Sequence, residues 1–438
     1  MTRDLLCENV SVNETGEHLQ FAGIDTVSLA KQYGTPLYLM DEDRIRNCCR
    51  AYKAAIRAAF GENGQVLYAS KASSFKRIYE IMREEGMGVD VVSIGEMYTA
   101  LKAGFPLSQA YFHSNNKTDA DIAFAMEHGI GYFVVDNEEE LVAIEREAAA
   151  RGIRQSVLLR ITPGIDPHTF EAVSTGKVDS KFGFAIETGA AEDILIKALT
   201  KPHIHVAGLH CHVGSQVFDA EVFLLTADVM LQFISDMQAR HGFVTELFDI
   251  GGGFGVRYLP SDPTLDLHSC IAEIGAFMKA KAAVLGIALP KISFEPGRSI
   301  VADAGMTLYT VGNVKSIPDF INYVSVDGGM TDNMRYALYT APYTLFQANA
   351  MNRPHDMTCT VVGRCCESGD IIQPDVKLPS DIQRGDIVAV LTTGAYHYSM
   401  ASNYNRLPRP PIVMLSGGNS YVAVRRETIE DLVALDLK

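Results

Sequence analysis

The stretch Val66-Leu-Tyr-Ala-Ser-Lys71 shows the pattern on which the predicted fold rests. Residues 66–70 form a short, mostly apolar run, which is typical of a β-strand buried on both faces. Residues 74–84 then place apolar side chains at helical spacing, which predicts a helix directly after the strand. Strands that alternate with helices in this way build parallel sheets.

Runs of the same kind recur along the chain up to residue 297. They lie at residues 88–93, 110–114, 132–136, 156–161, 205–213, 247–250 and 291–295. Stretches with helical periodicity separate them, and in one of these, residues 137–150, Asn137 is the predicted N-cap. Eight alternating units predict a closed (β/α)8 barrel of the TIM type. We place this barrel at residues 40–297.

The pattern changes after residue 300, where short β-like segments are joined by turns that contain glycine and proline. These segments are residues 307–315, 357–362, 386–393 and 411–415. They predict a second, all-β domain. Residues 37–40 also read as a strand and can belong to the same domain, which would then be discontinuous. The expected bounds of this domain are residues 1–39 and 298–438.

Composition narrows the class of protein. A formal net charge of −15 argues against a nucleic-acid partner, which requires a basic surface. We see no apolar signal core near the N-terminus and no apolar run close to the ~20 residues of a membrane helix, so no membrane association is expected. The eight cysteines form no C-x-x-C pair, which favours reduced thiols and a soluble, cytoplasmic protein.

Polar residues stand at the C-terminal end of every predicted barrel strand. They are Lys71, Asp90, Ser93, His113, Ser114, Asn115, Asp136, Arg160, His210, His212, Asp249 and Glu295. In a barrel of this kind the C-terminal strand ends form the active-site face. A polar residue often simply marks the end of a strand, but their presence at all eight ends favours a functional site.

Two glycine-containing loops follow the last two predicted strands, Asp249-Ile-Gly-Gly-Gly-Phe254 and Glu295-Pro-Gly-Arg298. Glycines let backbone N–H groups approach a phosphate, and such barrels often bind phosphate at this place. A tight turn explains a lone triple glycine equally well, but the second loop favours phosphate. No metal site is predicted: His210 and His212 lie on one expected strand, and we do not expect them to share one ion.

Lys71 suggests which phosphorylated group binds there. Burying the charge of a lysine at the end of an apolar strand costs free energy, so a function for that lysine is expected. A single such lysine more often only extends its charged end to solvent. Pyridoxal phosphate needs a lysine that bonds its aldehyde, a phosphate cradle and a partner for its ring nitrogen. Glu295 can be that partner, and His212 can stack on the ring.

The chain also carries an ordered set of motifs. They are Tyr68-Ala-Ser-Lys71, His212-Val-Gly-Ser215, Asp249-Ile-Gly-Gly-Gly-Phe254, Glu295-Pro-Gly-Arg298, Cys366-Glu-Ser-Gly-Asp370 and Gly394-Ala-Tyr396. This set resembles the diaminopimelate decarboxylases, pyridoxal-phosphate enzymes related to alanine racemase and ornithine decarboxylase. The resemblance implies decarboxylation of meso-2,6-diaminopimelate to L-lysine and carbon dioxide, the last step of lysine biosynthesis. One departure is Arg364, where the family usually has a proline.

The resemblance also implies roles for individual residues. Lys71, His212 and Cys366 would be catalytic, and the partner subunit of a homodimer would supply the cysteine to a shared site. The cofactor would be held by Lys71, His212, Ser215, Gly251, Gly252, Gly253, Glu295, Gly297, Arg298 and Tyr396. The distal carboxylate and ammonium of the amino-acid substrate would be bound by Arg298, Arg335, Tyr339, Glu367 and Tyr396.

Three alternatives stay open. The first is a decarboxylase for ornithine, lysine, arginine, carboxynorspermidine or a carrier-bound amino acid, against which Arg298, Arg335 and Glu367 argue together. The second is a non-catalytic protein that binds pyridoxal phosphate, although such proteins usually lack a β domain. The third, which the bare pattern allows, is a barrel enzyme acting on a sugar phosphate.

Overall fold

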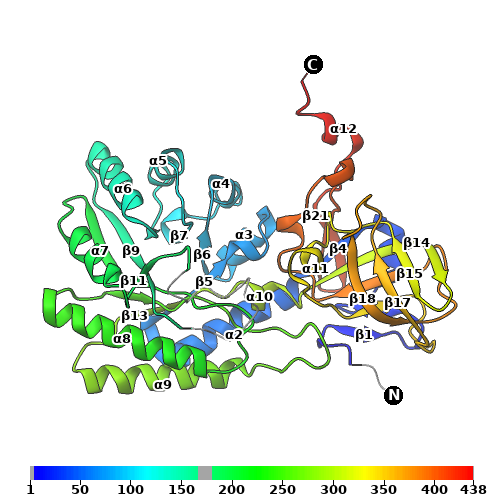
Figure 1. The fold of residues 1–438 in the computed structure, drawn as a ribbon, viewed down its shortest axis with the longest axis horizontal. Helices are drawn as coiled ribbons and strands as arrows, with labels where there is room; N and C mark the ends of the chain where they lie inside the picture. The colour runs from blue at the N-terminus through cyan, green and yellow to red at the C-terminus, as the bar shows by residue number, and fades with distance from the viewer. Residues whose placement is uncertain (1–3, 166–179, 438) are drawn as a thin grey trace. The chain divides into compact units, whose positions relative to one another are not determined.

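The computed structural model describes residues 4–165 and 180–437. Cys48–Gly255 and Thr264–Ser299 form one compact unit that contains a closed ring of eight parallel strands, so the predicted TIM-type barrel is confirmed (Figure 1). In ring order the strands are β5 (Gly64–Ala69), β6 (Gly88–Val91), β7 (Ala110–Phe112), β8 (Tyr132–Val135), β9 (Gln155–Thr162), β11 (Ile204–His210), β12 (Leu247–Asp249) and β13 (Lys291–Phe294).

Apolar side chains fill the inside of the barrel. Leu67, Tyr111, Leu158 and Leu247 belong to one buried cluster that draws residues from different strands. At Gly208 the pairing of β11 with β9 shifts register, and a Cβ atom there would lie 1.7 Å from the carbonyl oxygen of Leu247. Only glycine allows this close approach of two strands, which explains why the apolar run of β11 is interrupted there.

Helices connect the strands and lie around them in Figure 1. They are α2 (Glu42–Phe60), which begins in the other unit, α3 (Lys76–Glu84), α4 (Ile94–Lys102), α5 (Asp119–Glu127), α6 (Glu138–Arg151), α7 (Ala190–Leu199), α8 (Glu221–His241) and α9 (Leu267–Leu285). The predicted cap of α6 is confirmed, because the Asn137 side chain accepts a hydrogen bond from the backbone N–H of Glu140. Gly152 ends the same helix in the left-handed conformation that suits glycine.

Helix α8 departs from one sequence expectation. Its 21 residues are long and apolar enough to cross a membrane when judged by length and composition alone. The expectation that no segment would meet this test was therefore wrong. The apolar content has another explanation, because α8 packs against α9 and buries eight residues, including Phe223, Met230 and Ile234. A core helix of a barrel passes the same test.

The second compact unit comprises Met1–Asn47, Val256–Pro263 and Ile300–Lys438. Its larger sheet contains β4 (Leu37–Asp41), β14 (Gly305–Ile317), β15 (Ile321–Val326), β16 (Leu345–Gln347), β17 (Met357–Val362), β18 (Ile371–Leu378), β19 (Ile387–Leu391), β20 (Ile412–Ser416) and β21 (Asn419–Val424). The strands β1 (Val10–Val12), β2 (Leu19–Phe21) and β3 (Ile24–Asp25) form a separate small sheet. Because β4 pairs with both β14 and β20, the β region is discontinuous in sequence, as expected.

Candidate active site

Lys71 lies at the mouth of the barrel, in a short 3-10 turn, Ser70–Ala72, that directly follows β5. The loop after β13 packs beside it, because the backbone N–H of Ala69 donates to the carbonyl oxygen of Pro296 at 3.1 Å. A Cβ atom on Gly297 would lie 2.7 Å from the Cβ of Ala69. Glycine at position 297 therefore lets the Glu295 loop lie against the strand that carries Lys71.

Glu295 is buried and held through both of its carboxylate oxygens. The Nε2 atom of His113 lies 2.7 Å from Oε1, and the Nε2 atom of His210 lies 3.0 Å from Oε2. Burial alone would raise the pKa of Glu295, but the two imidazoles outweigh it and hold that pKa well below its ordinary value. The strand ends thus place a stable anion at the barrel mouth.

The predicted phosphate loop lies next to this anion. Gly251 and Gly253 have φ angles of +77° and +116°, and a Cβ on Gly252 would lie 2.1 Å from the carbonyl oxygen of Glu295. The Nε atom of Arg298 donates to Oγ of Ser215 at 3.1 Å, which joins the predicted cofactor residues of two loops. A residue larger than glycine at position 251 or 253 would strain the backbone, and one at position 252 would collide with the carbonyl oxygen of Glu295.

His212 occupies a different position from the one expected. Strand β11 ends at His210, so the prediction that both histidines lie on one strand was wrong. Beyond the strand the chain turns toward the glycine loop, where Nδ1 of His212 accepts a hydrogen bond from the N–H of Gly252 at 3.3 Å. Burial, reinforced by the positive charges of Lys71 and Arg160, lowers the pKa of His212 well below its ordinary value. His212 is thus a neutral ring beside the loop.

Two further carboxyl groups are buried at the same strand ends. Burial and the charge of Glu295 raise the pKa of both Asp90 and Asp249 well above the ordinary value. The positive charge of Lys71 opposes this effect at Asp90, which also accepts a hydrogen bond from the N–H of Ser70 at 3.1 Å. Several titratable groups with shifted pKa values at one barrel mouth are typical of an active site.

The predicted substrate residue Arg335 lies in the β unit, at the start of α11 (Arg335–Tyr339). It is buried and donates to the hydroxyl of Tyr343 at 2.6 Å. Its guanidinium also lies over the rings of Tyr258, Tyr343 and Tyr396, at 5.1, 5.6 and 5.9 Å from their centroids. The structure therefore brings Arg335 together with Tyr396, and it places Tyr339 at the other end of the same helix.

Cys366 and Glu367 lie in the turn between β17 and β18, and both are exposed. The N–H of Cys366 donates to the side chain of Asn405 at 2.8 Å. Asp370 organises the turn by accepting from the N–H of Cys365 at 2.6 Å. Within residues 4–165 and 180–437, no hydrogen bond or ion pair joins Glu367 to Arg335.

The sequence pattern does not indicate a role for several residues of these two clusters. His113 was noted only as the end of a strand, although it contacts Glu295 from 182 positions away. No sequence motif indicates Tyr258 and Tyr343, which surround Arg335. A tyrosine near a buried arginine has no local sequence signal, whereas the histidine at a strand end could have been paired with the carboxylate expected at the same face.

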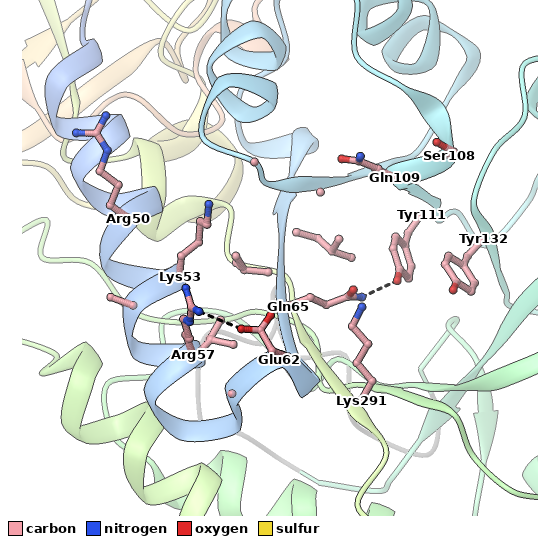
Figure 2. Close-up of a pocket in the computed structure, with 18 residues that line it drawn as sticks. Arg50, Lys53, Arg57, Glu62, Gln65, Ser108, Gln109, Tyr111, Tyr132 and Lys291 are labelled. Carbon is pink, nitrogen blue, oxygen red and sulfur yellow. Dashed lines mark hydrogen bonds and ion pairs between the residues drawn. The ribbon is translucent and has the colours of Figure 1, made fainter.

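A cavity of about 790 Å³ lies at the opposite, N-terminal ends of the barrel strands (Figure 2). The residues around it include Arg50, Lys53, Arg57 and Lys291, which are all exposed. None of the predicted site residues lines this cavity. Because active sites of such barrels lie at the C-terminal strand ends, the cluster around Glu295 is the candidate active site.

Comparison with known proteins identifies the family. Residues 42–302 match the family model described as "Pyridoxal-dependent decarboxylase, pyridoxal binding domain". The chain is 45% identical to the diaminopimelate decarboxylase of Bacillus subtilis over 420 residues, which cover 96% of this chain and 95% of that protein. This similarity extends through both compact units.

Solved structures give the same result. The crystal structure of diaminopimelate decarboxylase from M. jannaschii, in complex with L-lysine, superposes with a TM-score of 0.91 at 32% identity and covers 98% of each chain. A lysine/ornithine decarboxylase from Vibrio vulnificus, complexed with cadaverine, gives a TM-score of 0.75 at 25% identity and covers 89% of this chain and 97% of that one. The chain therefore belongs to the diaminopimelate decarboxylases, within the pyridoxal-dependent decarboxylase family.

Proposed function

We propose that this protein decarboxylates meso-2,6-diaminopimelate to L-lysine and carbon dioxide, with pyridoxal phosphate as its cofactor. The observation that carries the proposal is the 45% identity to a diaminopimelate decarboxylase over 96% of the chain. In the reaction one Cα–carboxylate bond breaks, its electron pair stays on Cα, and a proton takes the place of the lost carbon dioxide. The test is release of carbon dioxide and L-lysine from meso-diaminopimelate by the purified holoenzyme.

The residues at the barrel mouth fit pyridoxal phosphate. Lys71 offers an amine for its aldehyde, Glu295 a buried carboxylate for its ring nitrogen, and His212 a neutral ring beside the glycine loop. The phosphate and ring would also be held by Ser215, Gly251, Gly252, Gly253, Gly297, Arg298 and Tyr396. When bound, this cofactor supplies a ring that accepts electrons from a breaking bond at Cα.

The protein's own groups would then orient the substrate and move protons. Lys71 would hold the cofactor covalently, exchange it with the substrate amine and recover it on product release. Glu295 would keep a proton on the ring nitrogen, because a buried anion favours a neighbouring cation. Cys366 or Lys71 would return a proton to Cα. These roles are supported by the positions of Lys71 and Glu295 at one barrel mouth.

The second amino-acid head of the substrate distinguishes this reaction from simpler decarboxylations. Arg298, Arg335 and Tyr339 would bind its carboxylate, and Glu367 would bind its ammonium. Tyr396 would also contact the substrate. Support comes from Arg335, whose buried guanidinium is held among tyrosines and so is oriented in advance. Arg335→Ala should lower kcat/KM for diaminopimelate roughly 10- to 100-fold, the equivalent of a lost charged hydrogen bond of about 1.5–3 kcal/mol.

Arg353→Ala is the matched control, because Arg353 makes an exposed ion pair with Asp381 in the same unit. An unchanged kcat/KM in the Arg335 variant would place the distal carboxylate elsewhere. The rival activity is decarboxylation of another amino acid. A carbon dioxide assay with ornithine, lysine, arginine and carboxynorspermidine in parallel tests it, since preference for any of these over diaminopimelate would contradict the proposal.

We also propose a cytoplasmic homodimer with shared sites, in which Cys366 serves the partner's cofactor. The support is the exposed position of Cys366 in a turn and the resemblance of its Cys-Glu-Ser-Gly-Asp segment to the family motif. Mixing inactive Lys71→Ala with inactive Cys366→Ala protein should restore activity, because a mixed dimer has one site with both native residues. Mixtures that exchange subunits but stay inactive would exclude a shared site.

A further inference from the structure

The surroundings of Glu295 contain an unusual set of hydrogen-bond donors. His113 from the end of β7 and His210 from the end of β11 each direct Nε2 to a different oxygen of one carboxylate, at 2.7 and 3.0 Å. All three side chains are buried, and the two imidazole rings meet edge to face with centroids 4.8 Å apart. Both oxygens keep a second lone pair, so Glu295 can still accept a further hydrogen bond.

The position of the proton on His210 follows from its other ring nitrogen. Nδ1 of His210 is buried without a hydrogen-bond partner in the described part of the chain. A buried N–H without an acceptor costs about 1–3 kcal/mol, so the proton belongs on Nε2, where Glu295 accepts it. Burial also lowers the pKa of His210, and it lowers that of His113 to about 4. Both histidines are therefore neutral donors, and the charge is on Glu295.

Two competing carboxylates lie at the same barrel mouth. Asp90 accepts one backbone N–H, from Ser70, and Asp249 accepts one from Gly251 at 2.8 Å, while its Oδ2 atom has no hydrogen-bond partner in the described residues. Neither has an imidazole donor on each oxygen. Three neighbouring buried carboxyl groups cannot all be ionised without a large cost in free energy. The histidines decide which one keeps the charge.

Other charged groups face Glu295 but do not replace the histidines. Arg160, on β9, makes no hydrogen bond to Glu295 among the described residues. Its Nε atom lies 3.7 Å from Oδ1 of Asp136. Lys71 acts on Asp90 and His212 through its charge. Tyr111, whose hydroxyl accepts from Gln65 at 2.6 Å, has a raised pKa because it is buried, and it stays neutral.

We propose that His113 and His210 are positioning residues that confine one negative charge to Glu295, so that this carboxylate alone faces the cofactor's ring nitrogen. The inference rests on the proposed function only for the identity of that nitrogen. Without the two donors, burial raises the pKa of Glu295. Glu295 then takes up a proton at a higher pH. Activity and the protonated form of the ring are then lost at a higher pH than in the native enzyme.

The test uses two sets of holoenzyme variants. In the first set, His113→Leu, His210→Leu and the double leucine variant remove the donors. In the second set, His113→Gln and His210→Gln keep an N–H donor. We expect each leucine variant to lower kcat roughly 10- to 100-fold with a small change in KM, and to weaken cofactor binding in equilibrium dialysis. The acidic limb of the kcat profile and the pH titration of the visible spectrum should move to higher pH. The glutamine variants should recover most of each change.

His203→Gln is the matched control, since His203 contacts Glu145 at 3.2 Å, is only partly buried, and precedes β11 at the other end of the barrel. A measurement on native holoenzyme does not depend on the folding of the histidine variants. Its infrared difference spectrum against Glu295→Gln should show an ionised carboxylate, and no protonated carboxyl, from about pH 5 to 9.

Leucine variants with native kcat, cofactor affinity and spectrum would overturn the proposal, as would a protonated Glu295 in the infrared spectrum. The same three side chains present ligand-type atoms within 4.8 Å of one another, so a divalent cation is the rival occupant. One equivalent of metal in purified holoenzyme would also overturn the proposal. If the native protein binds the cofactor but releases no carbon dioxide from diaminopimelate, the proposed reaction fails while the spectral test of Glu295 still stands.

Discussion

The two ends of the barrel use charged residues in different ways. At the C-terminal strand ends Asp90, Arg160 and Glu295 are buried and surrounded by other polar groups. At the N-terminal ends, the cavity in Figure 2 is bordered by exposed cations such as Arg57 and Lys291. Burying a charge costs several kcal/mol, whereas a surface charge costs almost nothing. Buried charged residues therefore indicate which end of the barrel carries the site. Cavity size by itself does not identify the site.

The largest effect should come from Lys71→Ala, at the end of the barrel that carries the buried charges, although Lys71 itself is exposed. We expect turnover to fall below detection and the visible absorbance of the bound cofactor to disappear, because no other amine can take over the covalent bond. Steady-state kinetics and an absorbance spectrum measure both. Lys291→Ala, which removes an exposed lysine from the cavity, is the control. A Lys71→Ala protein that kept both activity and colour would contradict the contrast between the two ends.

The next largest effect concerns stability. Lys117 follows β7 and is buried, and its Nζ atom lies 2.8 Å from Oε1 of Glu140. Lys117→Met should lower the free energy of unfolding by about 3–5 kcal/mol, because it leaves the buried carboxylate of Glu140 without its partner. Burial already raises the pKa of Glu140 to about 7 in the native protein, despite the opposing charge of Lys117. Without Lys117, folded Glu140 binds its proton more tightly than the unfolded chain does.

The sign of the pH dependence follows from this difference. Stability of the Lys117→Met protein should fall as pH rises through and above 7, and the defect should shrink toward pH 5, where Glu140 is protonated in the folded state. Urea denaturation at several pH values measures it. Lys197→Met is the control, because Lys197 pairs with Glu138 on the surface. Equal losses in both variants would mean that burial does not set the cost.

A smaller effect is expected from the cap of α6, which begins at the same end of the barrel. Asn137→Ala removes the acceptor for the N–H of Glu140 at 2.9 Å and should lower the free energy of unfolding by about 1 kcal/mol. Asn137→Ser, which keeps a capping oxygen, should restore most of the loss. Chemical denaturation measures both, and similar stability of the two variants would show that the cap contributes little.

The smallest effect should come from the cavity end. Arg57 and Glu62 form an ion pair at 3.1 Å in which both side chains are more than three-quarters exposed. Arg57→Ala should change the free energy of unfolding by less than about 0.5 kcal/mol and leave kcat/KM unaltered. Denaturation and steady-state kinetics check this. A clear loss of activity would show that the cavity end takes part in function.

Much of the barrel could be predicted because each strand carries its own local signal. The apolar runs at residues 66–70 and 132–136 correspond closely to β5 and β8, and Asn137 caps the following helix. The end of β11 was placed three residues too late, because His212 continues the alternating pattern although its chain has turned to the glycine loop. Local pattern does not record where strand pairing stops.

By itself, the sequence determined the kind of fold and the end of the barrel at which to look, since periodicity and strand ends are local properties. It also pointed to Lys71 and Glu295, because their types and motifs are unusual at strand ends. Only the tertiary structure decided that His113 and His210 hold Glu295, and that Tyr258 and Tyr343 surround Arg335. Those contacts join distant segments, and they depend on how the folded chain closes around the groups that it buries.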